Sequence, residues 1–174
     1  MTISIEESGM IFGPFSEDQL FPIENSPLSK KIGDGIKVAE FVLLRDLQDK
    51  PQEVWFVEAK SSAPRQTEVF VEEIRQKFTN SVQLTLAACL RRHPHSEEHL
   101  PAGFLNLDLA NCAIKCILVI NQFPKEWMVG LRDALNKAMN TLTKTLGLRP
   151  GSVVVINDEM ARARNLISNQ EGRR

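Results

Sequence analysis

Two apolar, β-branched runs joined by a short polar segment constrain the fold of this chain more than any other feature. The first run covers residues 36–44 and the second covers residues 53–60. Two such runs on either side of a polar connection that contains Pro51 predict an antiparallel β-hairpin. Both runs are apolar at even and odd positions alike, so we expect the sheet that contains them to be covered on both faces.

Helices and strands alternate after this hairpin. A helix is predicted over about 68–92, where apolar residues recur every four positions and form one stripe. The stripe consists of Phe70, Ile74, Phe78 and Val82. Residues 113–120 have the composition of a third strand, and residues 153–156 have that of a fourth.

A second long helix is predicted over about 124–146, because Gly147 is a natural helix stop. The residues expected on its inner face are Trp127, Leu131, Leu135, Met139 and Leu142. A last helix is expected over about 158–167. The resulting order, β-β-α-β-α-β-α, predicts an α/β fold in which a mixed β-sheet carries helices on both faces.

Length and composition indicate one intracellular domain spanning residues 1–174. The chain is 43% apolar and 25% charged, close to globular averages, so neither a disordered nor a membrane class is favoured. The N-terminus lacks the features of a secretory signal, and three cysteines do not complete a disulfide framework, so a cytoplasmic location is expected. The net charge of −1 means that any binding of nucleic acid must rest on a local patch, a bound cation or a partner chain.

The register of the predicted hairpin places two carboxylates side by side. A symmetric pairing across the connection at 45–53 puts Val42 opposite Phe56 and Glu40 opposite Glu58. Two like charges on one face of a largely apolar sheet repel each other, and the repulsion is poorly screened there. The pattern therefore indicates a site that holds a cation better than it packs.

Glu40, Glu58 and Lys60 are the candidate site residues, since Lys60 lies two positions beyond Glu58 on the same face of its strand. Carboxylates from adjacent strands can share one or two Mg²⁺ or Mn²⁺ ions, which bind a phosphate oxygen and lower the pKa of an attacking water. The lysine can orient that water or stabilise the transition state. A structural interpretation stays open, in which Glu58 and Lys60 form an ion pair at a strand end and Glu40 reaches solvent.

The Glu-x-Lys motif at 58–60, on the second strand of a hairpin that is followed by a helix and a further strand, resembles the PD-(D/E)XK nuclease superfamily. Residues 57–64 look like the form found in small bacterial members of that superfamily. The resemblance covers about residues 30–125 and implies a restriction-endonuclease-like core. These nucleases usually carry Asp on the first hairpin strand, whereas this chain has Glu40.

The resemblance also suggests how the chain is divided. It implies an irregular N-terminal extension over 1–34, a nuclease-like core over about 35–125 and a C-terminal helix-strand-helix over 126–174. Glu24 corresponds to an upstream acidic residue that some members add. Asp34 is the only Asp shortly upstream of Glu40, and it falls beyond the predicted strand.

A metal-dependent deoxyribonuclease is the function that the resemblance implies, with Glu40 and Glu58 as ligands of Mg²⁺ or Mn²⁺ and Lys60 as the catalytic lysine. The alternative is a non-catalytic, nuclease-like subunit that works with a protein partner or as a homodimer. Small size, slight negative charge and Glu in place of Asp favour this alternative. A small-molecule-binding α/β domain is a third interpretation, because a fold alone does not decide function.

Three imidazoles lie close together in one polar segment, at His93, His95 and His99. They are compatible with a zinc site or with a solvated loop. No thiolates stand at zinc-finger spacing beside them, so the solvated loop is the preferred interpretation.

Overall fold

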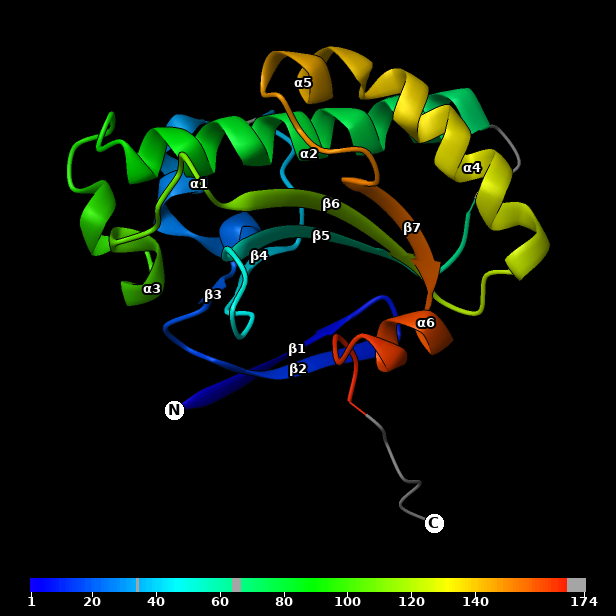
Figure 1. Cartoon of the computed structure of the whole chain (residues 1–174), viewed down its shortest axis with the longest axis horizontal. Coiled ribbons are helices and arrows are strands. Elements are labelled where there is room, and N and C mark those ends of the chain that lie inside the picture. The colour runs from blue at the N-terminus through cyan, green and yellow to red at the C-terminus, as the bar shows by residue number, and fades with distance from the viewer. Residues whose placement is uncertain (34, 64–66, 169–174) are drawn as a thin grey trace.

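A five-stranded mixed β-sheet forms the centre of the protein (Figure 1). The computed structural model describes residues 1–33, 35–63 and 67–168, so Asp34 lies outside the described residues. The strands run side by side in chain order, and their bounds are β3 Leu20–Phe21, β4 Phe41–Arg45, β5 Glu53–Lys60, β6 Ala113–Ile120 and β7 Val153–Asn157. β3, β4 and β5 are antiparallel, whereas β5, β6 and β7 are parallel. The mixed sheet of an α/β protein is therefore confirmed.

Two helical crossovers cover one face of this sheet, because parallel neighbours cannot be joined by a tight hairpin. α2 (Thr67–Cys89), the 3-10 turn η2 (Ser96–Glu98) and α3 (Ala102–Leu105) connect β5 to β6. α4 (Lys125–Ala138) and α5 (Asn140–Thr145) connect β6 to β7. Figure 1 shows α2, α4 and α5 on the same side of the sheet. None of the helices in the described part of the chain has the length and apolar character needed to cross a membrane.

The opposite face is covered mainly by a second sheet and by one short helix, so the expectation of helices on both faces is met only in part. β1 (Thr2–Glu7) and β2 (Met10–Ser16) form an antiparallel pair beneath the main sheet, beside the short helix α6 (Asp158–Ala163) (Figure 1). Phe12 of β2 packs edge-on against Phe41 of β4, with ring centroids 5.3 Å apart. A two-stranded sheet with one apolar face buries the exposed side of a larger sheet as well as a helix does.

The N-terminal region is more regular than its sequence suggested. Besides β1, β2 and β3, it contains the 3-10 turn η1 (Ile23–Asn25) and the short helix α1 (Pro27–Ile32). Ser26 caps α1, because its hydroxyl accepts a hydrogen bond from the Ser29 backbone N–H at 3.1 Å.

The first strand of the hairpin is shorter than predicted, since β4 begins at Phe41 and residues 36–40 are not part of a strand. The backbone N–H of Ala39 donates to the hydroxyl of Ser81 on α2, at 2.7 Å, and not to a neighbouring strand. Val38 and Ala39 are buried nevertheless. Their apolar character, which suggested a strand, reflects packing against α2.

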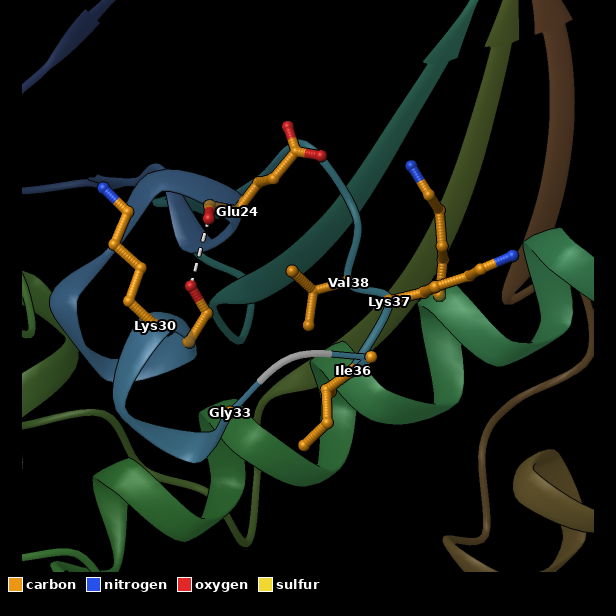
Figure 2. A pocket seen from close by; sticks show the side chains of 9 residues that line it. Glu24, Lys30, Gly33, Ile36, Lys37 and Val38 are labelled. Carbon is orange, nitrogen blue, oxygen red and sulfur yellow. Dashed lines mark hydrogen bonds between the residues drawn. The ribbon is translucent and has the colours of Figure 1, made fainter.

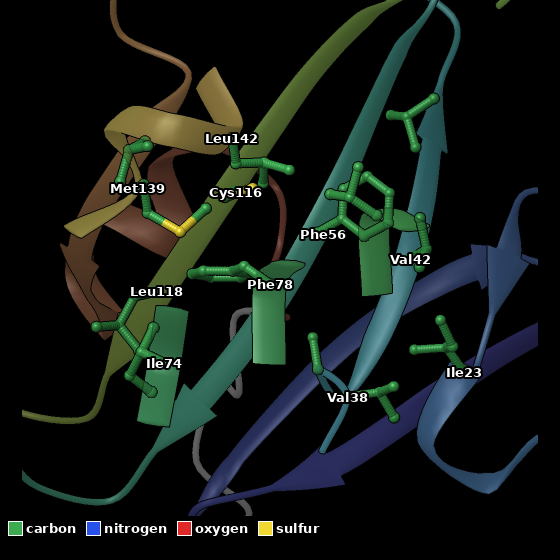
Figure 3. Packing of buried hydrophobic residues seen from close by; sticks show 14 of the residues in the cluster. Ile23, Val38, Val42, Phe56, Ile74, Phe78, Cys116, Leu118, Met139 and Leu142 are labelled. Carbon is green, nitrogen blue, oxygen red and sulfur yellow. The ribbon is translucent and has the colours of Figure 1, made fainter. Parts of the chain in front are cut away.

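The apolar stripe of α2 is confirmed and forms the centre of the larger core. Phe70, Ile74, Phe78 and Val82 are all buried. Figure 3 shows Ile74 and Phe78 packed among side chains that point up from the sheet, including Phe56 and Leu118. Even-numbered residues of β5 and β6 face this core because strand side chains alternate.

The second long helix differs from its prediction in two ways. It is divided at Met139 into α4 and α5. Trp127, expected on the inner face, is 62% exposed, whereas its neighbour Met128 is buried. The buried residues Met128, Leu131 and Leu135 lie at spacings of three and four and form the inner face of the helix. Trp127 lies one position away from this face. Its ring packs edge-on against that of Phe123, with ring centroids 6.0 Å apart.

We predict that Phe78→Ala lowers the free energy of unfolding by about 3–5 kcal/mol, because it removes a fully buried aromatic side chain and leaves a cavity. Urea denaturation at constant m-value measures the change. The matched control is Val69→Ala, on the exposed face of the same helix, which should change stability by less than about 0.5 kcal/mol. Equal effects of the two substitutions would contradict the packing of α2 described above.

Candidate functional site at the end of strand β5

Glu58 is the most deeply buried charged residue of the candidate site. It lies near the carboxyl end of β5, with its side chain on the α2 face, and its exposed fraction is 0%. Its Oε1 atom lies 2.8 Å from Nζ of Lys77 on α2 and 3.1 Å from Nζ of Lys60. Burying a carboxylate is costly unless it is paired, so these two ammonium groups are what stabilise Glu58 in this position.

Glu40, the residue directly before β4, places its carboxyl group in the same cluster. The predicted pairing of Val42 with Phe56 is confirmed, and Phe41 pairs with Val57. The pairing ends there, so the predicted Glu40–Glu58 pair is not formed: the Glu40 backbone N–H, just before β4, donates to the Val57 carbonyl at 3.1 Å, one residue out of register. The Oε1 atom of Glu40 then lies 3.7 Å from Nζ of Lys77. Both predicted carboxylates therefore contact one ammonium group.

Glu24, of the 3-10 turn η1, joins this cluster through a side-chain hydrogen bond with Glu40. Burial raises the pKa of Glu40 from its usual 4.5 to about 8, and the hydrogen bond with Glu24 and the charge of Glu58 act in the same direction. Burial likewise raises the pKa of Glu58, although Lys77 and Lys60 oppose it. With a pKa of about 8, Glu40 is mostly protonated at neutral pH, which relieves part of the crowding of negative charge.

Lys60 lies at the solvent side of the cluster, with 24% of its side chain exposed. Besides Glu58, it contacts Oε1 of Glu73 on α2 at 3.2 Å. Burial alone would lower the pKa of Lys60, but the two carboxylates raise it. The Asn121 backbone N–H donates to the Lys60 carbonyl at 2.9 Å, which holds the end of β5 against β6. Lys60 is thus a fully charged, oriented and partly accessible ammonium group.

The second carboxylate oxygen of Glu58 is left without a partner. Both ammonium groups contact Oε1, whereas Oε2 is buried and has no hydrogen bond to any described residue. A buried oxygen of this kind normally finds a donor or a cation. Among the described residues, however, no three His, Cys, Asp or Glu side chains are arranged around a common point as a ready metal centre.

A pocket of about 440 Å³ lies beside this cluster. Lys77 and Glu24 form part of its wall, so the carboxylate cluster borders a hollow open to solvent. Figure 2 shows Glu24, Lys30 and Lys37 around the pocket. Lys30 and Lys37 are exposed, which gives the rim of the pocket a local positive charge in an otherwise slightly acidic protein.

Two residues of the cluster, Lys77 and Glu73, were not identified from the sequence. Each directly precedes a buried residue of the α2 stripe, Phe78 and Ile74 respectively. Charged residues at the border of an apolar stripe are usually solvated. The one signal in the sequence was the spacing of four between Glu73 and Lys77, which places both on the same side of the helix. Glu24, which the resemblance singled out, does lie beside Glu40.

Two of the imidazoles at 93–99 have separate partners, and the described residues form no group of three metal-binding side chains there. Nδ1 of His95 lies 3.1 Å from a carboxylate oxygen of Glu98, and Nε2 of His99 lies 3.2 Å from Nζ of Lys31. Both contacts are on the surface, as in a solvated loop.

The raised pKa of Glu40 makes the stability of the protein depend on pH. Between about pH 4.5 and 8 the folded protein keeps a proton that the unfolded chain has lost, so stability falls as the pH rises through this window. Glu40→Gln, which imitates the protonated carboxyl group, should flatten the decline by up to about 1.4 kcal/mol per pH unit. Denaturant unfolding at several pH values compares the two proteins, and parallel curves would show that Glu40 titrates normally.

Comparisons with known protein families, with curated proteins and with solved structures find no significant match to this chain. The geometry of the cluster around Glu58 is therefore the basis on which a function is assigned.

Proposed function

We propose that the chain is a metal-dependent nuclease that hydrolyses DNA phosphodiester bonds through a PD-(D/E)XK-like site. Glu40 and Glu58 would hold Mg²⁺ or Mn²⁺, and the ammonium group of Lys60 would act on the substrate. The observation that carries this proposal is Oε2 of Glu58, which is buried beside a second carboxyl group and has no hydrogen-bond partner among the described residues. An oxygen in that position lacks a ligand, and a hard cation is the ligand that carboxylates bind best.

The arrangement of the elements supports the same assignment. The hairpin β4–β5 is followed by α2 and then by β6, which is the element order of the PD-(D/E)XK core, and Glu58 and Lys60 occupy the Glu-x-Lys positions on the second hairpin strand. Glu40, directly before the first hairpin strand, stands close to the position where these nucleases have their other acidic residue. A restriction-endonuclease-like core is part of the proposal.

Each side chain has a distinct task in this scheme. Two carboxyl groups would supply oxygen ligands. β5 holds Glu58 in place, and a backbone hydrogen bond to Val57 holds Glu40. A divalent cation bound there supplies Lewis acidity toward a phosphate oxygen. The ammonium group of Lys60 orients the attacking water and stabilises the negative charge that develops on the phosphoryl oxygens. Glu73 positions Lys60 through its contact at 3.2 Å.

DNA as the substrate requires positive charge near the site, because the chain carries a net charge of −1. Lys30 and Lys37 supply it at the rim of the adjacent pocket (Figure 2). Contacts from such lysines to phosphate groups position a nucleic acid without reading its sequence.

A second candidate is a non-catalytic, nuclease-like subunit that binds DNA or a protein partner, including a second copy of the chain. The observation that favours it is the position of Lys77, whose ammonium group already contacts both Glu40 and Glu58. Full burial of Glu58 points in the same direction, since a working ligand needs access for the cation.

We predict that Lys60→Met reduces Mn²⁺-dependent cleavage of labelled DNA by about 100-fold or more, the usual effect of removing a group that stabilises transition-state charge. Its affinity for Mn²⁺, measured by calorimetry, should be kept or slightly increased, because a positive charge near the cation is lost. Glu58→Gln should lose both cleavage and binding, because the cation loses an anionic ligand.

Lys115→Met is the matched control for these variants. Lys115 pairs with Glu53 at 2.9 Å on the same sheet, at the other end of β5, so its removal breaks a comparable ion pair away from the site. Cleavage and metal binding should both be unchanged. A parent protein that binds Mn²⁺ at millimolar concentration without cleaving DNA, or that does neither, would favour the non-catalytic subunit.

A further inference from the structure

We propose that Lys77 is a built-in competitor of the metal ion, an ammonium group that occupies the cation position between Glu40 and Glu58 and must leave before a divalent cation binds. The inference rests on the proposed function, since it concerns the same carboxylates. It assigns to Lys77 a role as the residue that sets metal affinity.

The position of the Lys77 ammonium group is the first observation behind this inference. Nζ lies 2.8 Å from Oε1 of Glu58 and 3.7 Å from Oε1 of Glu40, so a single cationic group bridges a carboxyl group on β5 and one directly before β4. A bridging cation between carboxylates is also the arrangement expected of a bound divalent metal. An ammonium group and a metal cannot share that space, because like charges a few ångströms apart repel strongly in a poorly solvated site.

The unpartnered oxygen of Glu58 is the second observation, and it is independent of the first. Lys77 and Lys60 both contact Oε1 and leave Oε2 buried without a partner. The lysines therefore compensate the charge of Glu58, but they contact only one of its two carboxylate oxygens. A cation with several coordination positions would contact oxygens that a single ammonium group does not reach.

The path for Lys77 to leave is the third observation. Its side chain is 11% exposed and forms part of the wall of the 440 Å³ pocket. The ammonium group can therefore turn into the pocket by rotation of its own flexible side chain, while the backbone of α2 stays in place. Ser81 maintains that backbone, because its hydroxyl donates to the Lys77 carbonyl at 2.7 Å and accepts from Ala39.

This competition explains why the carboxylates do not form a ready metal centre among the described residues. The carboxyl groups of Glu40 and Glu58 are arranged around the Lys77 ammonium group, which contacts one oxygen of each. Metal occupancy would then depend on the difference in binding free energy between the metal ion and the Lys77 ammonium group. The site would fill only at a metal concentration high enough to displace the lysine.

Removing the Lys77 charge tests the inference by calorimetric titration of the full chain with Mn²⁺. Lys77→Met and Lys77→Gln should bind Mn²⁺ at least about tenfold more tightly than the parent, because a competing charge at contact distance is lost. Lys77→Gln keeps a donor for Glu58 and provides a second route if Lys77→Met does not fold. Lys115→Met, which removes a paired lysine elsewhere on the sheet, should leave the affinity unchanged.

Acetylation of the parent protein, followed by mass spectrometry, gives a readout that needs no substitution. Lys77 should be protected without metal and should be acetylated faster when Mn²⁺ is bound, as its ammonium group moves into the pocket. Lys115 serves as the internal reference, with a rate that does not depend on Mn²⁺.

The outcomes separate this inference from the proposed function. Tight Mn²⁺ binding by the Lys77 variants together with no binding by the parent would support the competition and reject metal-dependent activity of the parent. Binding by the parent with no gain in the variants, and no change in Lys77 acetylation, would overturn the competition and leave the nuclease assignment standing. No Mn²⁺ binding by any of the proteins would overturn both.

Discussion

A fully buried carboxylate, that of Glu58, is the constraint on which the architecture of this protein depends. An ionised carboxyl group in a protein interior costs several kcal/mol unless opposite charge and hydrogen bonds compensate for it. Lys60 supplies compensation from the same strand, and Lys77 supplies it from α2. Because one partner lies on the sheet and the other on the helix, the ion pair defines where α2 sits along β5. The apolar contacts of Ile74 and Phe78 supply the area that is buried, but such contacts tolerate sliding more readily than a buried ion pair does.

The mixed order of the sheet makes this cluster possible. The antiparallel pairing of β4 with β5 brings Glu40 beside Glu58, and the parallel pairing of β5 with β6 requires the crossover helix α2, which carries Lys77 over both carboxylates. The turn η1, which follows the edge strand β3, adds Glu24. Residues far apart in the chain therefore meet at one end of β5, where three carboxyl groups, those of Glu40, Glu58 and Glu73, contact two ammonium groups. The buried Oε2 of Glu58, which has no partner among the described residues, is the physical reason to expect a further cation.

Much of the fold could be predicted because hydrophobic periodicity reports directly on burial. The bounds of β5 and β6, the stripe of α2 and the pairing of Val42 with Phe56 all follow from runs that are either continuously apolar or apolar every fourth residue. The errors arose at apolar residues that are buried outside the sheet or that stay exposed. Val38 and Ala39 pack against α2 outside the sheet, and Trp127 lies at the start of a helix, where its ring meets Phe123 and stays exposed.

The sequence by itself determined the α/β class, the hairpin and the positions of Glu40, Glu58 and Lys60 on one face of it, because strand alternation and pairing are local rules. It did not determine that Glu58 is fully buried or that Lys77 neutralises it. A lysine at the border of an apolar stripe can extend into solvent or turn beneath the helix, and the sequence is the same in both cases. Only the docking of α2 on the sheet decided between them, because the cost of an unpaired buried carboxylate draws the nearest ammonium group to within 2.8 Å.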